Sequence, residues 1–303
     1  MIAVTLLDVL LGVGVLVAAT AALIHPDRVA SVTTFLAVGV LLIAVWARLG
    51  APDVALAEAA LAAGVTGAML IATVARDTDR VRALRWPALA GELLVALGLG
   101  GALGVVLVGA AALPGQDSLA WQATDQLGEA AVSHPVTAVL LDYRAYDTLL
   151  EIVVLTVAAI AALSLHPRGS LRSVDVPVDR RPALVGLVRV LAPVLALLAA
   201  WLLVAGSSQP GGAFQSGAVI TGLLMLALLT GGVRVPPGPL LRALIVVGAL
   251  VFLALAVLTA GAGGWLQLAP PWGGAAVVAV EAALAVSIGV ALAVLIVAQE
   301  PSR

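Results

Sequence analysis

The sequence predicts an all-α, polytopic membrane protein whose chain crosses the bilayer about nine times as helices. Three observations predict this class. Of the 303 residues, 62% are hydrophobic and only 11% are charged, whereas a soluble domain carries about 25% charged residues. The apolar residues form blocks of about 18 to 25, which is the length that spans a hydrocarbon core about 30 Å thick. The short alternating segments of a membrane β-barrel are missing, so helices must satisfy the backbone hydrogen bonds.

The apolar blocks divide the chain into predicted helices that are separated by prolines or polar turns. Proline suits such places because its fixed φ fits a first helical turn, where its missing N–H is not needed. The first block has no positively charged leader, so we interpret it as a retained helix rather than a signal peptide. The helices are expected at residues 4–25, 29–48, 52–75, 88–112, 147–166, 183–205, 212–232, 240–261 and 275–298.

The distribution of arginine predicts the orientation. The sequence contains no lysine, and its arginines gather in alternate connections, above all in 76–87 and 167–182. The intervening connections hold only Arg48 and Arg144. Because cytoplasmic loops carry the excess of Lys and Arg, we expect the N-terminus outside and the C-terminus in the cytoplasm. In the long outer connection 113–146, an amphipathic segment with Trp121 is expected on the membrane interface.

Several chemistries are excluded by composition. With no cysteine, the chain has no disulfide, thiolate metal site or Cys nucleophile. The only histidines, His25, His134 and His166, each precede a proline and are spaced too far apart in sequence to form a ligand pair. No catalytic triad, phosphate-binding loop or basic nucleic-acid stripe is present. We therefore expect no catalytic residue, no metal site and no cofactor, and a protein that is not an enzyme.

Acidic side chains inside predicted helices are the best candidates for function, because a carboxylate within the bilayer costs several kcal/mol. At 1.5 Å per residue, Glu58, Glu151 and Glu281 lie about 9, 6 and 9 Å below the outer ends of their helices. They would therefore share a layer in the outer half. Glu92 would lie about 6 Å from the cytoplasmic end of its helix. These acids can form a proton or cation path, or they can be hydrogen-bonded packing residues.

Acids near helix ends have a more ordinary alternative as interfacial residues. Asp8, Asp53 and Asp147 belong to this group. Asp147 and Glu151 are four residues apart and share one helix face, whereas Asp53 and Glu58 diverge by about 140°. Arg189, the one base within a helix, is expected to extend its side chain toward the cytoplasmic surface.

Glycines open the predicted helix that begins near residue 212. Gly211 and Gly212 can leave a helix N-terminus that meets an anion or a carboxylate. The alternative is that small residues here only let helix backbones approach closely.

Three passages resemble the Mrp-type multisubunit Na⁺/H⁺ antiporter and its relatives in membrane-bound hydrogenases. GAPDVALAEAALAAG at 50–64 is similar to the GAPDxALTEAxxGAG helix of the Mrp A C-terminal region and of the hydrogenase D-type subunit. LLDYRAYDTLLEI at 140–152 resembles the VDFRGFDTLGEI stretch at the end of Mrp A and in the E-type subunit. PGGAFQSG at 210–217 resembles the PGGGFQGG signature of the Mrp B (MnhB) subunit.

The resemblance implies how the chain divides into units and which of its acids match the family motifs. It implies a three-helix D-type unit at 1–86, a two-helix E-type unit with a long external loop at 87–170, a cytoplasmic Arg-rich linker at 171–182 and a four-helix Mrp B-like unit at 183–303. Asp53 and Glu58 match the D-type motif, and Asp142, Asp147 and Glu151 match the E-type motif. The family glycines are replaced at Ala145, Leu150 and Ala213, which puts close helix contacts in doubt. Glu92 and Glu281 lie outside the motifs.

The resemblance also implies a function and partners. The chain is expected to be a subunit of a cation/proton antiporter in the inner (plasma) membrane, with Glu58, Glu151, Glu92, Glu281, Asp147 and Asp53 as candidate residues of the ion or proton path. Lys-bearing antiporter-like subunits would be separate proteins, because this chain lacks lysine. Small Mrp C-, E-, F- and G-type subunits, lipid, Na⁺ and H⁺ are the other expected partners, and nucleic acid is not. Residues 183–303 would mainly pack against partners and lipid.

Two alternatives remain open from the sequence. The same module can belong to a redox-driven complex such as a membrane-bound hydrogenase, in which this chain would hold no redox centre. It can also be a passive scaffold whose carboxylates only tie helices together.

Overall fold

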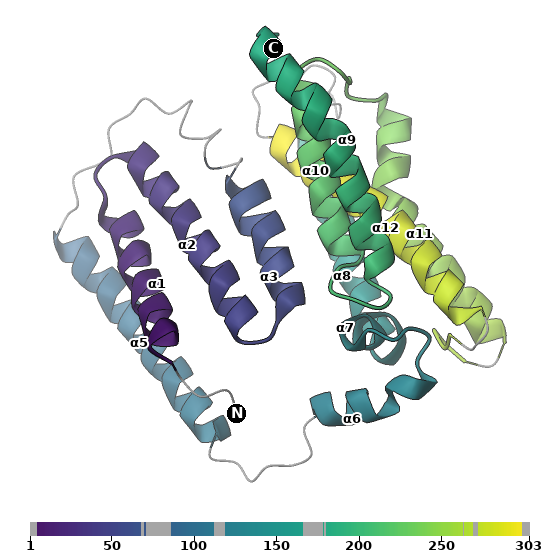
Figure 1. Cartoon of the computed structure of the whole chain (residues 1–303), viewed down its shortest axis with the longest axis horizontal. Helices are drawn as coiled ribbons and strands as arrows, with labels where there is room; N and C mark the ends of the chain where they lie inside the picture. Colours follow the sequence, from purple (N-terminus) through teal and green to yellow (C-terminus); the bar gives the residue numbers. More distant parts are fainter. Residues whose placement is uncertain are drawn as a thin grey trace.

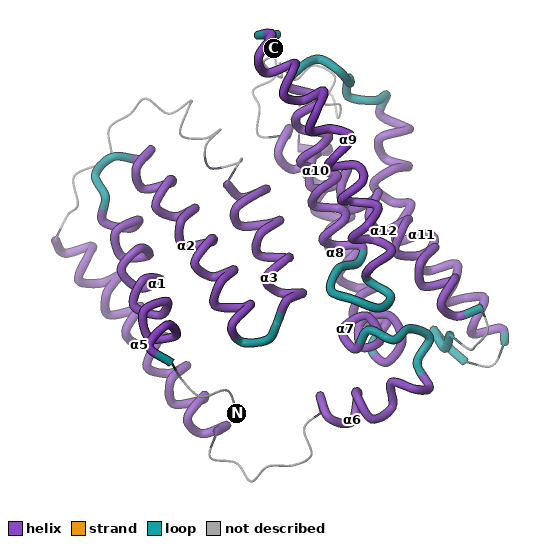
Figure 2. Tube along the Cα trace, in the orientation of Figure 1, coloured by secondary structure: helices purple, strands orange, loops and turns teal. Residues whose placement is uncertain are grey.

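The computed structural model describes residues 5–67, 70, 86–111, 119–165, 178, 180–262, 264–268 and 272–298. Helices and their connections make up this part of the chain, in which no strand occurs (Figure 2). The described elements are α1 (Leu6–Ile24), α2 (Arg28–Arg48), α3 (Pro52–Glu58), η1 (Ala59–Thr66), α5 (Trp86–Ala111), α6 (Leu119–Asp125), η2 (Gln126–Glu129), α7 (Pro135–Ala138), η3 (Val139–Tyr143), α8 (Ala145–Leu165), α9 (Pro182–Ala205), α10 (Ala213–Leu229), α11 (Gly238–Gly261) and α12 (Gly273–Val297).

The predicted apolar blocks are helical wherever the structure describes them. Six of the described helices, namely α1, α2, α8, α9, α11 and α12, are long and apolar enough to cross a membrane. Two shorter apolar stretches, Leu94–Val106 and Ala213–Leu229, are helical as well. The all-helical, multi-pass prediction is therefore confirmed, while the count of nine crossings and the orientation stay predictions.

The first two helices form an antiparallel hairpin. The side chain of Asp27 caps α2 by accepting a hydrogen bond from the backbone N–H of Val29 at 3.0 Å. At the other end of the hairpin, Arg48 Nε lies 2.9 Å from Asp8 Oδ1. Asp8 thus sits in the first turn of α1 as the partner of an arginine, which is the ordinary alternative for an acid near a helix end.

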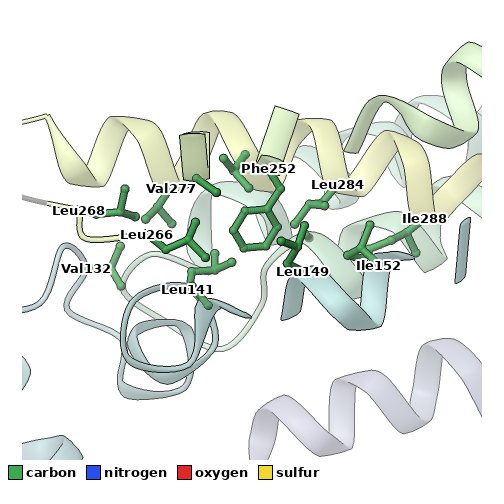
Figure 3. Packing of buried hydrophobic residues seen from close by; sticks show 14 of the residues in the cluster. Val132, Leu141, Leu149, Ile152, Phe252, Leu266, Leu268, Val277, Leu284 and Ile288 are labelled. Carbon is green, nitrogen blue, oxygen red and sulfur yellow. The ribbon is translucent and has the colours of Figure 1, made fainter. Parts of the chain in front are cut away.

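The largest hydrophobic core lies in the C-terminal half, around α12. Phe252 from α11, Leu149 and Ile152 from α8, and Leu284 and Ile288 from α12 pack together there (Figure 3). Figure 1 shows α8 to α12 gathered on one side of the molecule and α1, α2, α3 and α5 on the other.

Small residues let α10 approach α12, as the sequence predicts. A Cβ atom added at Gly217 would lie 2.8 Å from Cβ of Ile288, which is closer than real Cβ contacts come. Because lipid is as apolar as the helices, the hydrophobic effect does not hold helices together inside a membrane, and close backbone packing of this kind contributes instead.

Two π-helical stretches differ from the expected winding. The predicted helix 52–75 is α-helical only through Glu58 and continues as the π-helix η1 to Thr66, and a second π-helix, η3, precedes α8. The length of an apolar block predicts that a segment is helical. It does not predict the type of helix, because a π turn differs from an α turn only by about one extra residue. Such turns occur frequently at functional sites, and both stretches adjoin the cavity described next.

Residues 113–146 hold several short helical pieces where they are described. Trp121 lies in α6 with 61% of its surface exposed, so the expected short segment exists. Its place on a membrane interface stays a prediction.

Candidate functional site

A cavity of about 330 Å³ lies where α3, α7, η3, α8, the start of α10 and α12 meet. Three carboxylic acids from segments far apart in the chain line it: Asp53, Glu151 and Glu281. Its other polar groups come from Thr137, Thr148 and Gln215 and from the backbone at 211–213, and apolar side chains complete the wall. The connections 49–51 and 206–212 border this end of the bundle, which is the end predicted to face outside.

Asp53 is held by three separate segments. Pro52 opens α3, which places Asp53 in its first turn, where the residue is 8% exposed. One carboxylate oxygen, Oδ2, lies 3.0 Å from Nε2 of His134. The other, Oδ1, accepts a hydrogen bond from the backbone N–H of Gly211 at 3.2 Å. Gln215 donates to the backbone carbonyl of Asp53 at 3.3 Å. Both oxygens of Asp53 are therefore engaged, and the residue ties α3 to the loop before α7 and to the start of α10.

Glu281 occupies the inner wall, within α12, and is 3% exposed. Its carboxylate is hydrogen-bonded to the backbone N–H of Ala213, the first residue of α10. A helix N-terminus carries unpaired N–H groups and a partial positive charge that favour a carboxylate. The second oxygen, Oε2, is buried and has no hydrogen-bond partner among the described residues. The start of α10 thus lies at a carboxylate, which is one of the two roles expected of Gly211 and Gly212.

Gly212 is required for this contact. It has φ 109° and ψ −170°, a backbone conformation that is essentially confined to glycine. A Cβ atom at this position would lie 2.8 Å from Oε1 of Glu281. A side chain here would therefore displace the carboxylate from the start of α10.

Glu151 reaches the cavity from α8. Its side chain is exposed, unlike those of Asp53 and Glu281, and no hydrogen-bond partner is described for it. Thr148, one turn earlier, also lines the cavity and donates to the carbonyl of Leu140 in η3 at 2.6 Å. Glu151 is thus the least buried of the three carboxylic acids that line the cavity.

Glu58 and Asp147 are not among the residues that line the cavity. Glu58 is half-buried at the last residue of α3, and Asp147 is exposed and paired with Arg144. The backbone of Glu92 belongs to α5, but its side chain lies outside the described residues. Of the three acids for which a shared layer was predicted, Glu151 and Glu281 line the cavity and Glu58 does not; the layer itself stays a prediction.

Two residues of the site were not predicted from the sequence. His134 has no second histidine near it in sequence, and its partner in the structure is an aspartate. Gln215 is uncharged, so the cost of burying a charge does not single it out. The signals in the sequence were that Asp53 and His134 each adjoin a proline at connections on the same predicted side of the membrane, and that Gln215 lies within the PGGAFQSG passage.

Among the described residues, no three His, Cys, Asp or Glu side chains are grouped so that they could hold a metal ion. A buried carboxylate is costly unless it is paired, and one oxygen of Glu281 has no partner among the described residues.

Breaking the Asp53–His134 contact is expected to destabilise the protein. In a His134→Ala variant, one oxygen of a buried carboxylate loses its partner, which costs about 1–3 kcal/mol. The measurement is the free energy of unfolding in detergent, combined with Asp53→Asn in a double-mutant cycle. Arg48→Gln is the control, because it removes a less buried pair of similar length and is expected to cost less than about 1 kcal/mol. If His134→Ala and Arg48→Gln lowered the free energy of unfolding equally, the buried contact would contribute no more to stability than the pair of Arg48 and Asp8.

Comparison with known proteins identifies two parts of the chain. Residues 13–78 match the family model of MbhD, the D-type component of MBH, and residues 183–299 match that of a domain related to the MnhB subunit of Na⁺/H⁺ antiporters. The first match contains Asp53, and the second contains Gly211, Gln215 and Glu281.

A curated relative and two solved structures are also similar. The chain is 28% identical over 182 residues to the probable A/B subunit of a K⁺/H⁺ antiporter from Rhizobium meliloti (strain 1021), a match that covers 51% of this chain and 17% of the relative. A chain of the Mrp complex from Dietzia sp. DQ12-45-1b matches with a TM-score of 0.82 and 23% identity, covering 99% of this chain and 35% of the other.

The second structure is a chain of the membrane-bound sulfane sulfur reductase, an archaeal respiratory membrane complex. It matches with a TM-score of 0.59 and 20% identity, covering 71% of this chain and all of the other. At these identities both structures show a shared fold. Together with the two family models, these likenesses identify the chain as a fusion of the Mrp A/B type, which joins a domain of the MbhD family to a domain related to MnhB of the antiporters.

Proposed function

We propose that the chain is a membrane subunit of a cation/proton antiporter and that its cavity forms part of the ion or proton path. One observation carries this proposal: carboxylic acids from α3, α8 and α12 converge on a single cavity, in which one oxygen of the buried Glu281 is unpartnered among the described residues. Acids at membrane depth that face a cavity commonly mark such paths.

The three acids differ in their hydrogen bonds, and we infer a different role for each. Both oxygens of Asp53 are engaged by His134 and Gly211, so Asp53 organises the wall. Glu281 keeps one oxygen on the start of α10, and its other oxygen is buried without a described partner. Glu151 has no described partner and is exposed. We infer that Glu151 passes a proton or cation between the outer side and Glu281.

The proposal gives the MnhB-related part more than a packing role. Residues 183–303 were expected mainly to contact partners and lipid, yet the same part supplies Gly211, Gly212, Gln215 and Glu281 to the cavity. With no lysine in the chain, the buried Lys residues of antiporter-like subunits would come from separate proteins, together with small Mrp C-, E-, F- and G-type subunits. The complex would lie in the plasma membrane and act in transport rather than as an enzyme.

The exchanged cation is proposed only as a monovalent ion. The curated relative is named for K⁺/H⁺ exchange and the matching domain for Na⁺/H⁺ exchange. Both ions therefore belong in the assay.

The test is cation-dependent proton exchange in everted vesicles that contain the whole complex, with Na⁺ and K⁺ supplied in turn. Glu151→Gln is expected to lower exchange at least about fivefold, equivalent to about 1 kcal/mol, while the complex stays assembled on a native gel. Glu129→Gln, an exposed acid of η2 outside the cavity, is the matched control and should exchange normally. Asp147→Asn, one turn from Glu151 but outside the cavity, should cause a smaller loss. Unchanged exchange in Glu151→Gln would favour the scaffold alternative.

A redox-driven complex is the second candidate function. The match of residues 13–78 to the MbhD family and the fold shared with the sulfane sulfur reductase complex favour it. In that case the cavity would still conduct protons or cations, but electron transfer in a partner subunit would drive their movement. A neighbouring gene for a nickel–iron or iron–sulfur subunit would support this candidate.

A further inference from the structure

A second cavity lies at the opposite end of the same helices. It has a volume of about 260 Å³ and is enclosed by the end of α10, the loop that follows, the start of α11 and the end of α12. It shares no lining residue with the first cavity, although Ile288 of the first and Val290 of the second are only two residues apart in α12. This cavity is therefore separate from the proposed ion path, and it lies at the end predicted to face the cytoplasm.

The lining of this second cavity is apolar except at one point. Leu224 and Leu228 of α10 and Val290, Ala293 and Val297 of α12 form its walls, and Arg234 is the one charged residue among the lining. The wall of α12 extends from Val290 to Val297, about 10 Å along the helix axis. The cavity is therefore a narrow apolar slot along the helices, with a positive charge in the loop at its cytoplasmic end.

The positive charge there is not neutralised within the described part of the chain. Arg234 and Arg242, the latter in the second turn of α11, are both exposed. Neither forms an ion pair with a described residue, and no acid lines the cavity. Basic pockets between membrane helices on the cytoplasmic side attract anionic lipid headgroups.

We propose that this second cavity binds an anionic phospholipid, with one acyl chain in the slot and the headgroup phosphate on Arg234. The one charged residue of the lining is an arginine, so an occupant that joins an apolar chain to an anionic group fits this lining, as a phospholipid does. A single extended hydrocarbon chain fits a slot of this shape. Arg242, one turn into α11, adds a second positive charge for the headgroup.

The first experiment locates the lipid without altering the protein. Phosphatidylglycerol that carries a photoreactive group in its acyl chain is incorporated into membranes containing the full chain, cross-linked by light, and mapped by mass spectrometry of peptides. Labelling is expected in residues 224–244 and 290–297. Labelling spread evenly over the exposed apolar helices, with no excess in these two segments, would overturn the proposal.

The second experiment measures the preference for the headgroup. Native mass spectrometry compares binding of phosphatidylglycerol and phosphatidylcholine with identical acyl chains to the full chain in detergent. Arg234→Gln is expected to lower phosphatidylglycerol affinity about fivefold, the effect of one arginine near a lipid surface, and to leave phosphatidylcholine unaffected. Val290→Phe, which fills the slot, should weaken both lipids.

The control is Arg189→Gln, which removes an exposed arginine from α9 outside the second cavity. It is expected to leave both lipids unaffected, and melting temperatures in detergent verify that each variant is folded. Equal affinity for the two lipids in the wild type, or equal losses in Arg234→Gln and Arg189→Gln, would mean that the cavity does not select an anionic headgroup.

Discussion

Replacing Glu281 with glutamine is expected to lower cation/proton exchange by on the order of a hundredfold, the usual loss when a positioned proton-transfer group is removed. The amide oxygen can keep the hydrogen bond from Ala213, so the start of α10 stays in place. The amide nitrogen cannot take up or release a proton, and it repels a cation. The measurement is exchange in everted vesicles at equal amounts of assembled complex.

The thermal stability of the Glu281→Gln variant shows whether a loss of exchange has a structural cause. Glu281→Gln removes a buried carboxylate with one unpartnered oxygen, so the midpoint of thermal unfolding should stay equal or rise. Asp8→Asn, which alters the pair with Arg48 and lies outside the cavity lining, is the control and should exchange normally. If the Glu281→Gln variant still exchanged cations and protons normally, Glu281 would not belong to the proposed path.

Replacing Gly212 with alanine is expected to cost at least about 2 kcal/mol of stability, from a glycine-only backbone conformation and from the overpacked Cβ atom. That Cβ atom would meet Oε1 of Glu281 at 2.8 Å. The neighbouring wall cannot yield easily, because a Cβ atom at Gly206 would itself lie 2.5 Å from Cα of Gly212. The measurement is the free energy of unfolding in detergent, together with assembly on a native gel.

Gly222→Ala is the matched control for this prediction. Gly222 belongs to the same helix, and a Cβ atom there would meet nothing within 4 Å. Alanine in an open helix interior should add about 0.5–1 kcal/mol of stability. If Gly212→Ala were as stable as Gly222→Ala, the tight start of α10 would have no structural importance.

The helices were predictable because the bilayer imposes a simple rule on sequence. Apolar blocks bounded by Pro52, Pro182 or Pro239 predict the starts of α3, α9 and α11 to within about two residues, near the usual uncertainty of helix ends. The rule measures length and hydrophobicity only. It therefore could not distinguish α from π winding in η1 and η3, since both satisfy the same backbone groups.

The site was predictable only in part, and the reason is physical. The cost of placing a carboxylate within an apolar helix draws attention to Glu151 and Glu281 in the sequence, as it does to Glu58 and Glu92. Asp53 lies at a helix end, where an acid needs no special explanation. His134 lies in a connection, and only the fold brings it to a residue 81 positions away. Residues whose role depends on a distant partner carry no local signal.

The π-helix η1 also bears on how this chain can evolve. It comprises Ala59–Thr66 and follows directly on α3, which carries Asp53 in its first turn. Loss of one codon within residues 59–66 can be absorbed as a change from π to α winding, because a π turn holds more residues than an α turn. The stretch is therefore expected to tolerate such a deletion better than the end of α3, where the same loss would turn Asp53 by about 100° relative to the residues that follow.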